Sequence, residues 1–208
     1  DQSDPLSGNL GREGGMLLRL LILLLLAGCA SLTPQQQTVW QGAQPFVDAV
    51  AKEYGTRPVT LMVGSHARGT GGTMREEGLL TVDPSWLGSQ ASLELMLAHE
   101  MAHWIRGDHK RRRDLWRETW PNRITFYERW RDQEFETDVL AVEVLQRVKK
   151  VDEAEAVGRL HRQYRGTRAR LKAGTGTRND EHHPPCMKIR LLRERFPAQR
   201  DRLQACED

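Results

Sequence analysis

The most informative segment of the chain runs from Leu93 to Trp104 and reads Leu-Glu-Leu-Met-Leu-Ala-His-Glu-Met-Ala-His-Trp. Its apolar residues predict a helix that is buried nearly all round. His99 and His103 lie four positions apart, so both imidazoles project from one helical face and can bind one zinc ion. Glu100 follows the first histidine, where its carboxylate can take a proton from a metal-bound water. Because burial of these groups is costly unless they are satisfied, the pattern predicts a catalytic metal site.

Around this helix the sequence predicts one α+β domain, mostly helical, with a small sheet near its N-terminus. Turn and cap residues bound the expected elements: Asp83-Pro84 and Ser89 precede the central helix, and Gly107 ends it. The first expected element is a helix from Thr33 to Gly55, in which Trp40, Phe46, Val47 and Val50 face inward. Two strands, at 58–64 and 79–82, are expected to pair with each other. Further helices are expected at 122–150 and 152–172, and one or two short helices at the end of the chain.

The third metal ligand has two candidates. Glu134 and Asp138 lie four apart on a predicted helix, so Glu134 can reach the metal while Asp138 orients a ligating histidine. The alternative for this pair is an acidic, solvated helix face. The rival ligand is His109, which has the spacing of the metzincin proteases, although Arg106 stands where their glycine should be. A solvated His109 is the simpler explanation of that residue.

Three blocks, taken together and in order, resemble the gluzincin metalloproteases of the HtpX, Ste and Oma type. They are the segment 94–103, the segment 134–138 with Ala141, and His183-Pro184-Pro185 before a basic amphipathic helix. The resemblance implies a zincin-like metalloprotease domain with Zn²⁺ bound by His99, His103 and Glu134, Glu100 as general base, and Asp138 supporting a ligand. It also implies that His183 lies near the active cleft. Thr137 stands where the family usually has alanine, and residues 66–72 read as a loop where an edge strand is expected.

The segment from Met16 to Cys29 predicts export. One basic residue precedes a leucine-rich core that is too short to span a bilayer and fits a signal peptide. Leu26-Ala27-Gly28-Cys29 resembles the bacterial lipobox, which implies that Cys29 is lipidated and becomes the mature N-terminus. Ala30 implies the outer membrane, facing the periplasm, rather than the inner membrane. The sequence thus divides into 1–15 as a non-native or misassigned start, 16–28 as signal peptide, 29–37 as tether, and 38–208 as the metalloprotease domain.

The two remaining cysteines, Cys186 and Cys206, predict a disulfide in an oxidising compartment, with two free thiols as the alternative. Such a bond would contribute roughly 3 kcal/mol to stability in the chain-entropy model.

The formal net charge is +3, and the basic run Lys110 to Arg113 is typical of a solvated helix face, with no interleaved aromatic pattern. We therefore expect no nucleic-acid partner, whereas anionic lipid headgroups are a second use for this run.

These observations predict a lipid-anchored zinc metalloendopeptidase of the cell envelope that acts on protein or peptide substrates. His183 and Tyr127 are candidates for the donor that stabilises the developing oxyanion. The alternative is a protease-like module that assists folding or assembly of envelope proteins and has a silent metal site. A metzincin-type protease that uses His109 is the second alternative.

Overall fold

Helix α4 (Gln90–Arg106) is the element around which the fold is built in this computed structural model, which describes residues 32–64, 72–175 and 181–206. The Ser89 side chain caps its N-terminus, and Gly107 ends it in the left-handed conformation, as the sequence predicts. The residues from Leu93 to Ala98 are all buried, together with Met101 and Ala102. The predicted all-round burial is therefore confirmed for the part of the helix from Leu93 to Ala98.

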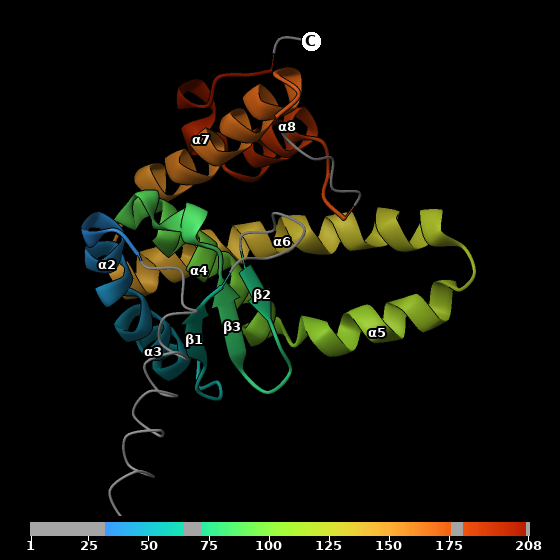
Figure 1. Ribbon diagram of the computed structural model, residues 1–208. Helices are drawn as coiled ribbons and strands as arrows, with labels where there is room; N and C mark the ends of the chain where they lie inside the picture. Colours follow the sequence, from blue (N-terminus) through green and yellow to red (C-terminus); the bar gives the residue numbers. More distant parts are fainter. Residues whose placement is uncertain (1–31, 65–71, 176–180, 207–208) are drawn as a thin grey trace, which may run out of the picture. The chain divides into compact units, whose positions relative to one another are not determined.

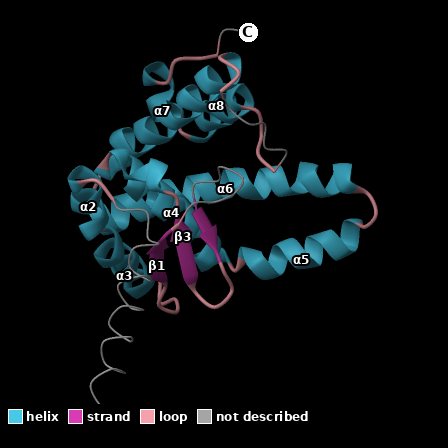
Figure 2. Cartoon of the chain, in the orientation of Figure 1, coloured by secondary structure: helices cyan, strands magenta, loops and turns pink. Residues whose placement is uncertain are grey.

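A three-stranded sheet accompanies α4, with the strand order β1-β3-β2. Strands β1 (Thr60–Val63) and β3 (Leu79–Val82) pair in parallel, with Thr60 opposite Leu79. The pairing of these two strands is confirmed. The third strand, β2 (Gly72–Met74), pairs antiparallel with β3 and was not predicted, because its residues follow a glycine-rich segment. Figure 2 shows this small sheet beside a mostly helical chain.

Two helices, not one, precede the sheet: α2 (Pro34–Gln41) and α3 (Ala43–Glu53). The predicted start at Pro34 is confirmed, but the chain breaks at Gly42, where a Cβ would lie 2.9 Å from Nε2 of Gln90. The break lets α3 bury Phe46, Val47 and Val50 as predicted, whereas Trp40 is only partly buried. A short 3-10 helix, η1 (Pro84–Gly88), leads into α4.

After α4 the chain forms α5 (Asp108–Thr119) and α6 (Arg123–Lys149), which run side by side and are joined by a short turn (Figure 1). Helix α6 also packs against α4, so the segments 93–104 and 134–138 belong to helices in direct contact. The bounds of α6 and of α7 (Glu153–Lys172) confirm the predicted helices. The general prediction of a mostly helical α+β fold with a small sheet is also confirmed.

The chain closes with α8 (Pro185–Arg195) and the 3-10 helix η2 (Pro197–Arg202). A disulfide joins Cys186, in the first turn of α8, to Cys206 after η2, which confirms the predicted pairing. Helix α8 packs on α7 and buries Lys188, Ile189 and Leu192.

Among the described residues, no helix has the length and apolar character needed to cross a bilayer. Cys29 and the predicted signal peptide lie outside the described residues.

Candidate metal centre

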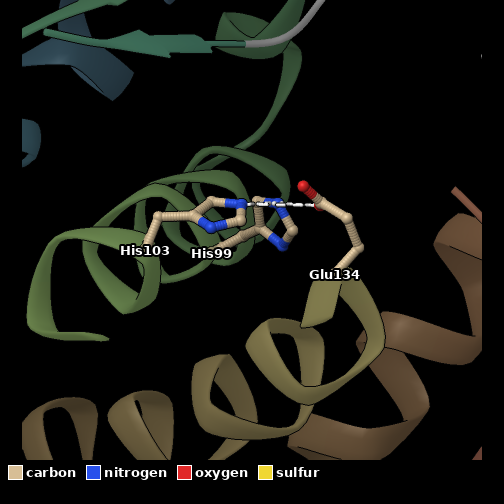
Figure 3. Close-up of side chains that lie close together, drawn as sticks. All are labelled: His99, His103 and Glu134. Atoms are coloured by element: carbon tan, nitrogen blue, oxygen red, sulfur yellow. Dashed lines mark hydrogen bonds and ion pairs between the residues drawn. The ribbon is translucent and has the colours of Figure 1, made fainter. Parts of the chain in front are cut away.

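Three side chains from two helices converge at the contact between α4 and α6. His99 and His103 project from α4 and the Glu134 carboxylate projects from α6, all pointing toward one another (Figure 3). Oε2 of Glu134 lies 3.5 Å from Nε2 of His99 and 3.4 Å from Nε2 of His103. The two Nε2 atoms are 3.1 Å apart. This geometry allows all three side chains to bind one metal ion.

The hydrogen bonding around the three side chains fits a cation between them. Nδ1 of each histidine faces a carboxylate, so in the neutral, metal-binding form of the imidazoles each Nδ1 carries the proton and each Nε2 presents a lone pair. In that neutral form, the buried Oε2 of Glu134 has no hydrogen-bond partner among the described residues. Two imidazole lone pairs and a buried carboxylate oxygen therefore meet without a donor between them. A divalent cation would satisfy all three.

Asp138 holds His99 in place, as the sequence predicts. Its Oδ1 accepts the hydrogen bond from Nδ1 of His99 at 2.9 Å. Its Oδ2 accepts hydrogen bonds from the Tyr164 hydroxyl at 2.6 Å and from Nζ of Lys188 at 2.7 Å. Burial alone would raise the pKa of Asp138, but Lys188 and His99 outweigh it and hold the pKa far below its usual range. The carboxylate is thus ionised and fixed in orientation.

Asp108 holds the imidazole of His103 in the same way, a role that the sequence did not predict. Oδ2 of Asp108 accepts a hydrogen bond from Nδ1 of His103 at 2.9 Å, and the residue is 2% exposed. The same carboxylate accepts hydrogen bonds from Thr137 at 3.3 Å and from Arg106 at 3.4 Å. The available signal was an aspartate directly after Gly107, the glycine at which the chain turns back. Thr137, which stands at a position where the resembling proteases usually have alanine, therefore helps to hold the Asp108 carboxylate.

The three ligand side chains have strongly shifted pKa values. Burial alone would lower the pKa of His99, but hydrogen bonds to Asp138 and Glu134 raise it to about 10. For His103 burial is likewise outweighed, by hydrogen bonds to Asp108 and Glu134, and its pKa rises to about 9. Burial would raise the pKa of Glu134, yet the two histidines hold it well below its usual range. The site therefore favours positive charge between its ligands, carried by protons or by a metal ion.

Glu100 lies in the same turn of α4 as His99, and its side chain is partly buried. Within the described part of the chain, no group forms a hydrogen bond or ion pair with its carboxylate. A carboxylate that is not committed to a structural contact remains available as a proton acceptor.

His109 does not join the metal group, in contrast to the metzincin alternative. It lies in the first turn of α5, where its ring is edge-on to Trp104 with a centroid separation of 6.3 Å. Its Nε2 is buried and has no hydrogen-bond partner among the described residues. Burial lowers the pKa of this histidine. The structure therefore groups Glu134, and not His109, with His99 and His103.

Of the two adjacent histidines, His182 contacts the metal group, whereas the predicted His183 contacts a different carboxylate. Nδ1 of His182 is 3.3 Å from Oε2 of Glu134, whereas Nε2 of His183 contacts Asp132 at 2.9 Å. Proline follows both histidines, and the turn into α8 determines which of the two faces inward. Burial and the neighbouring Lys188 lower the pKa of His182 to about 4, so it is neutral at pH 7.

Tyr127, the other candidate oxyanion donor, packs instead against the apolar cluster of Leu115, Phe126 and Trp130 between α5 and α6.

Comparisons of the chain with protein-family models, with curated protein sequences and with solved structures gave no match.

Proposed function

We propose that this protein is a zinc-dependent metalloendopeptidase, with a zincin-like domain of the gluzincin HtpX, Ste and Oma type. One observation carries the proposal: His99, His103 and Glu134 converge from α4 and α6 while the uncommitted Glu100 lies in the same helical turn. Two imidazoles and one carboxylate form a ligand set that proteases use for catalytic zinc, with one position left for water or substrate. A purely structural zinc would have no use for Glu100.

His99, His103 and Glu134 would hold the zinc, with Asp138 and Asp108 fixing the two imidazoles. When bound, the zinc polarises the scissile carbonyl and lowers the pKa of the attacking water. Glu100 accepts the proton from that water and passes it to the leaving amine. His182, which is neutral and adjacent to Glu134, replaces His183 as the side chain that donates a hydrogen bond to the developing oxyanion.

The proposal places the enzyme in the cell envelope, lipid-anchored to the outer membrane and facing the periplasm. The short apolar segment and Leu26-Ala27-Gly28-Cys29 support export and lipidation at Cys29. The disulfide between Cys186 and Cys206 supports an oxidising compartment. Protein or peptide substrates in that compartment follow from the proposed activity.

The substitution Glu100→Gln tests catalysis. It keeps the size of the side chain and leaves the three metal ligands intact, so zinc content and circular dichroism should not change. Hydrolysis of casein should fall by a factor on the order of a hundred or more, because the proton acceptor is lost. Wild type, the variant and a chelator-treated sample are compared at equal protein concentration.

Equal activity of wild type and Glu100→Gln, both with zinc bound and on folded and unfolded substrates, would favour the assembly module with a silent metal site. His182→Ala is included, because a histidine that blocks the metal at rest would also give an inactive wild type. If His182→Ala cleaves casein although wild type does not, the protease is latent.

A further inference from the structure

Large apolar side chains are exposed at the turn between α5 and α6. Trp120 is 60% exposed and Ile124 is 72% exposed. Among the described residues, Met62 is the one other large hydrophobic side chain that is exposed, and it is less exposed than these two. Figure 1 shows the turn at the end of the α5–α6 pair. Two of three such side chains therefore meet at one turn, which we call the hairpin tip and define as residues 117–124.

The hairpin tip is presented by a rigid support. Trp116 packs edge-on against Phe126, with ring centroids 5.0 Å apart, and Trp120 lies 5.2 Å from Trp116. The Asn122 side chain caps α6 by accepting from the backbone N–H of Thr125 at 3.1 Å. The hairpin thus has its own apolar interior, and the exposure of Trp120 and Ile124 does not result from a poorly formed turn.

Basic side chains surround the hairpin tip. Segment 109–131 contains eight Lys and Arg residues against three Asp and Glu residues, an excess of five positive charges. Lys110, Arg113 and Arg117 recur at spacings of three and four, so they share the solvent-facing side of α5. The Arg117 side chain is 75% exposed and lies 3.6 Å from its ion-pair partner Asp114, whereas Arg123 has no ion pair or hydrogen bond within the described residues. These two charges flank the exposed tryptophan.

We propose that the hairpin tip docks on a membrane surface rich in anionic lipid, with Trp120 and Ile124 in the interfacial region and Arg117 and Arg123 on the headgroups. Tryptophan favours this region because its ring is apolar and its N–H is polar, and basic residues are attracted to anionic headgroups. Two exposed side chains are too few for a stable protein interface, which buries about 800 Å² on each partner. The proposal goes beyond the proteolytic function and does not depend on it.

A fluorescent label tests the location of the hairpin tip. Ile124→Cys in the full chain carrying Cys29→Ser gives one reactive thiol, because Cys186 and Cys206 are joined. An environment-sensitive label at this position should shift to the blue with phosphatidylcholine vesicles that contain phosphatidylglycerol, and less with phosphatidylcholine alone. The same label at Lys52→Cys, an exposed position on α3, should not shift. Residues 16–28 are present in both proteins, so their effect cancels.

Charge removal tests the partner. Arg117→Gln with Arg123→Gln should raise the lipid concentration at half-maximal shift about twenty-five-fold, since each basic residue near the surface contributes about fivefold. Lys52→Gln with Lys172→Gln removes the same charge elsewhere and should have no effect. An unshifted label at position 124, equal shifts at positions 124 and 52, or a shift that depends on protein concentration without vesicles would overturn the proposal, the last in favour of self-association.

Discussion

The Asp108 carboxylate is buried, yet it contacts three side chains at once: His103, Thr137 and Arg106. Its charge and position fix the imidazole of His103 in one orientation and one tautomer. Carboxylates in this position raise the basicity of a ligating histidine and reduce the entropy lost on metal binding. The contribution of Asp108 to metal affinity can therefore be measured separately from that of the ligands.

We predict that Asp108→Asn weakens zinc affinity by about tenfold or more, because the asparagine keeps a hydrogen-bond acceptor but loses the negative charge. Competition with a fluorescent chelator measures this change. Asp114→Asn, an exposed aspartate in the same helix, is the matched control and should leave the affinity unchanged. Equal affinities in all three proteins would show that His103 is held by α4 packing alone.

The identity of the third ligand can be tested in the same assay. Glu134→Ala should lose most of its zinc on dialysis, because two histidines alone bind the ion weakly. His109→Ala should retain about one zinc per chain, since this residue lies outside the metal group. The opposite pattern, with metal lost from the His109 variant only, would establish the metzincin arrangement and refute the one proposed here.

At the scale of elements, α8 completes the support of the metal site from a distant part of the chain. Its Lys188 is 8% exposed and donates to the same carboxylate that holds His99. The disulfide lies in the first turn of this helix and restricts its position. The stability of the C-terminal segment and the orientation of a metal ligand are therefore linked through one ion pair.

Lys188→Met should reduce the free energy of unfolding by about 3 kcal/mol, because it leaves the buried Asp138 charge without its cation. Lys172→Met at the exposed end of α7 provides the control and should change stability little. Denaturant unfolding of the metal-free proteins gives both values. An unfolding free energy equal to wild type would mean that His99 and Tyr164 satisfy Asp138 without the lysine.

At the scale of the whole molecule, metal binding is coupled to pH. In the metal-free protein the pKa values of His99 and His103 are about 10 and 9, above the unfolded value of 6.5. Their protons stabilise the metal-free fold fully below pH 6.5, and this stabilisation is lost as the pH rises through 9 and 10. A bound ion replaces these protons, so it does not share that loss.

We therefore predict that the difference in Tm between the zinc-loaded and the metal-free protein increases from pH 6.5 to pH 9. Thermal unfolding followed by circular dichroism at several pH values measures both Tm series. His109→Ala, which leaves the metal group intact, should show the same trend. A constant difference across this range would mean that the two histidines carry no protons in the metal-free protein.

Local periodicity and capping residues were enough to predict several features of the fold and of the site. Ser89 and Gly107 bound α4, the spacing of His99 and His103 places them on one face, and Glu134 and Asp138 share a face of α6. The cysteine pairing followed from counting. These features are readable because helix geometry relates neighbouring residues in a fixed way.

Only the tertiary structure decided the features that depend on contacts between distant segments. The break at Gly42 reflects the approach of Gln90, and β2 forms because β3 supplies its hydrogen-bond partners. The choice of His182 over His183 depends on how the turn before α8 meets α6, and the choice of Glu134 over His109 on how α6 packs against α4. Local sequence does not encode such distances, because they result from the packing of whole helices against one another.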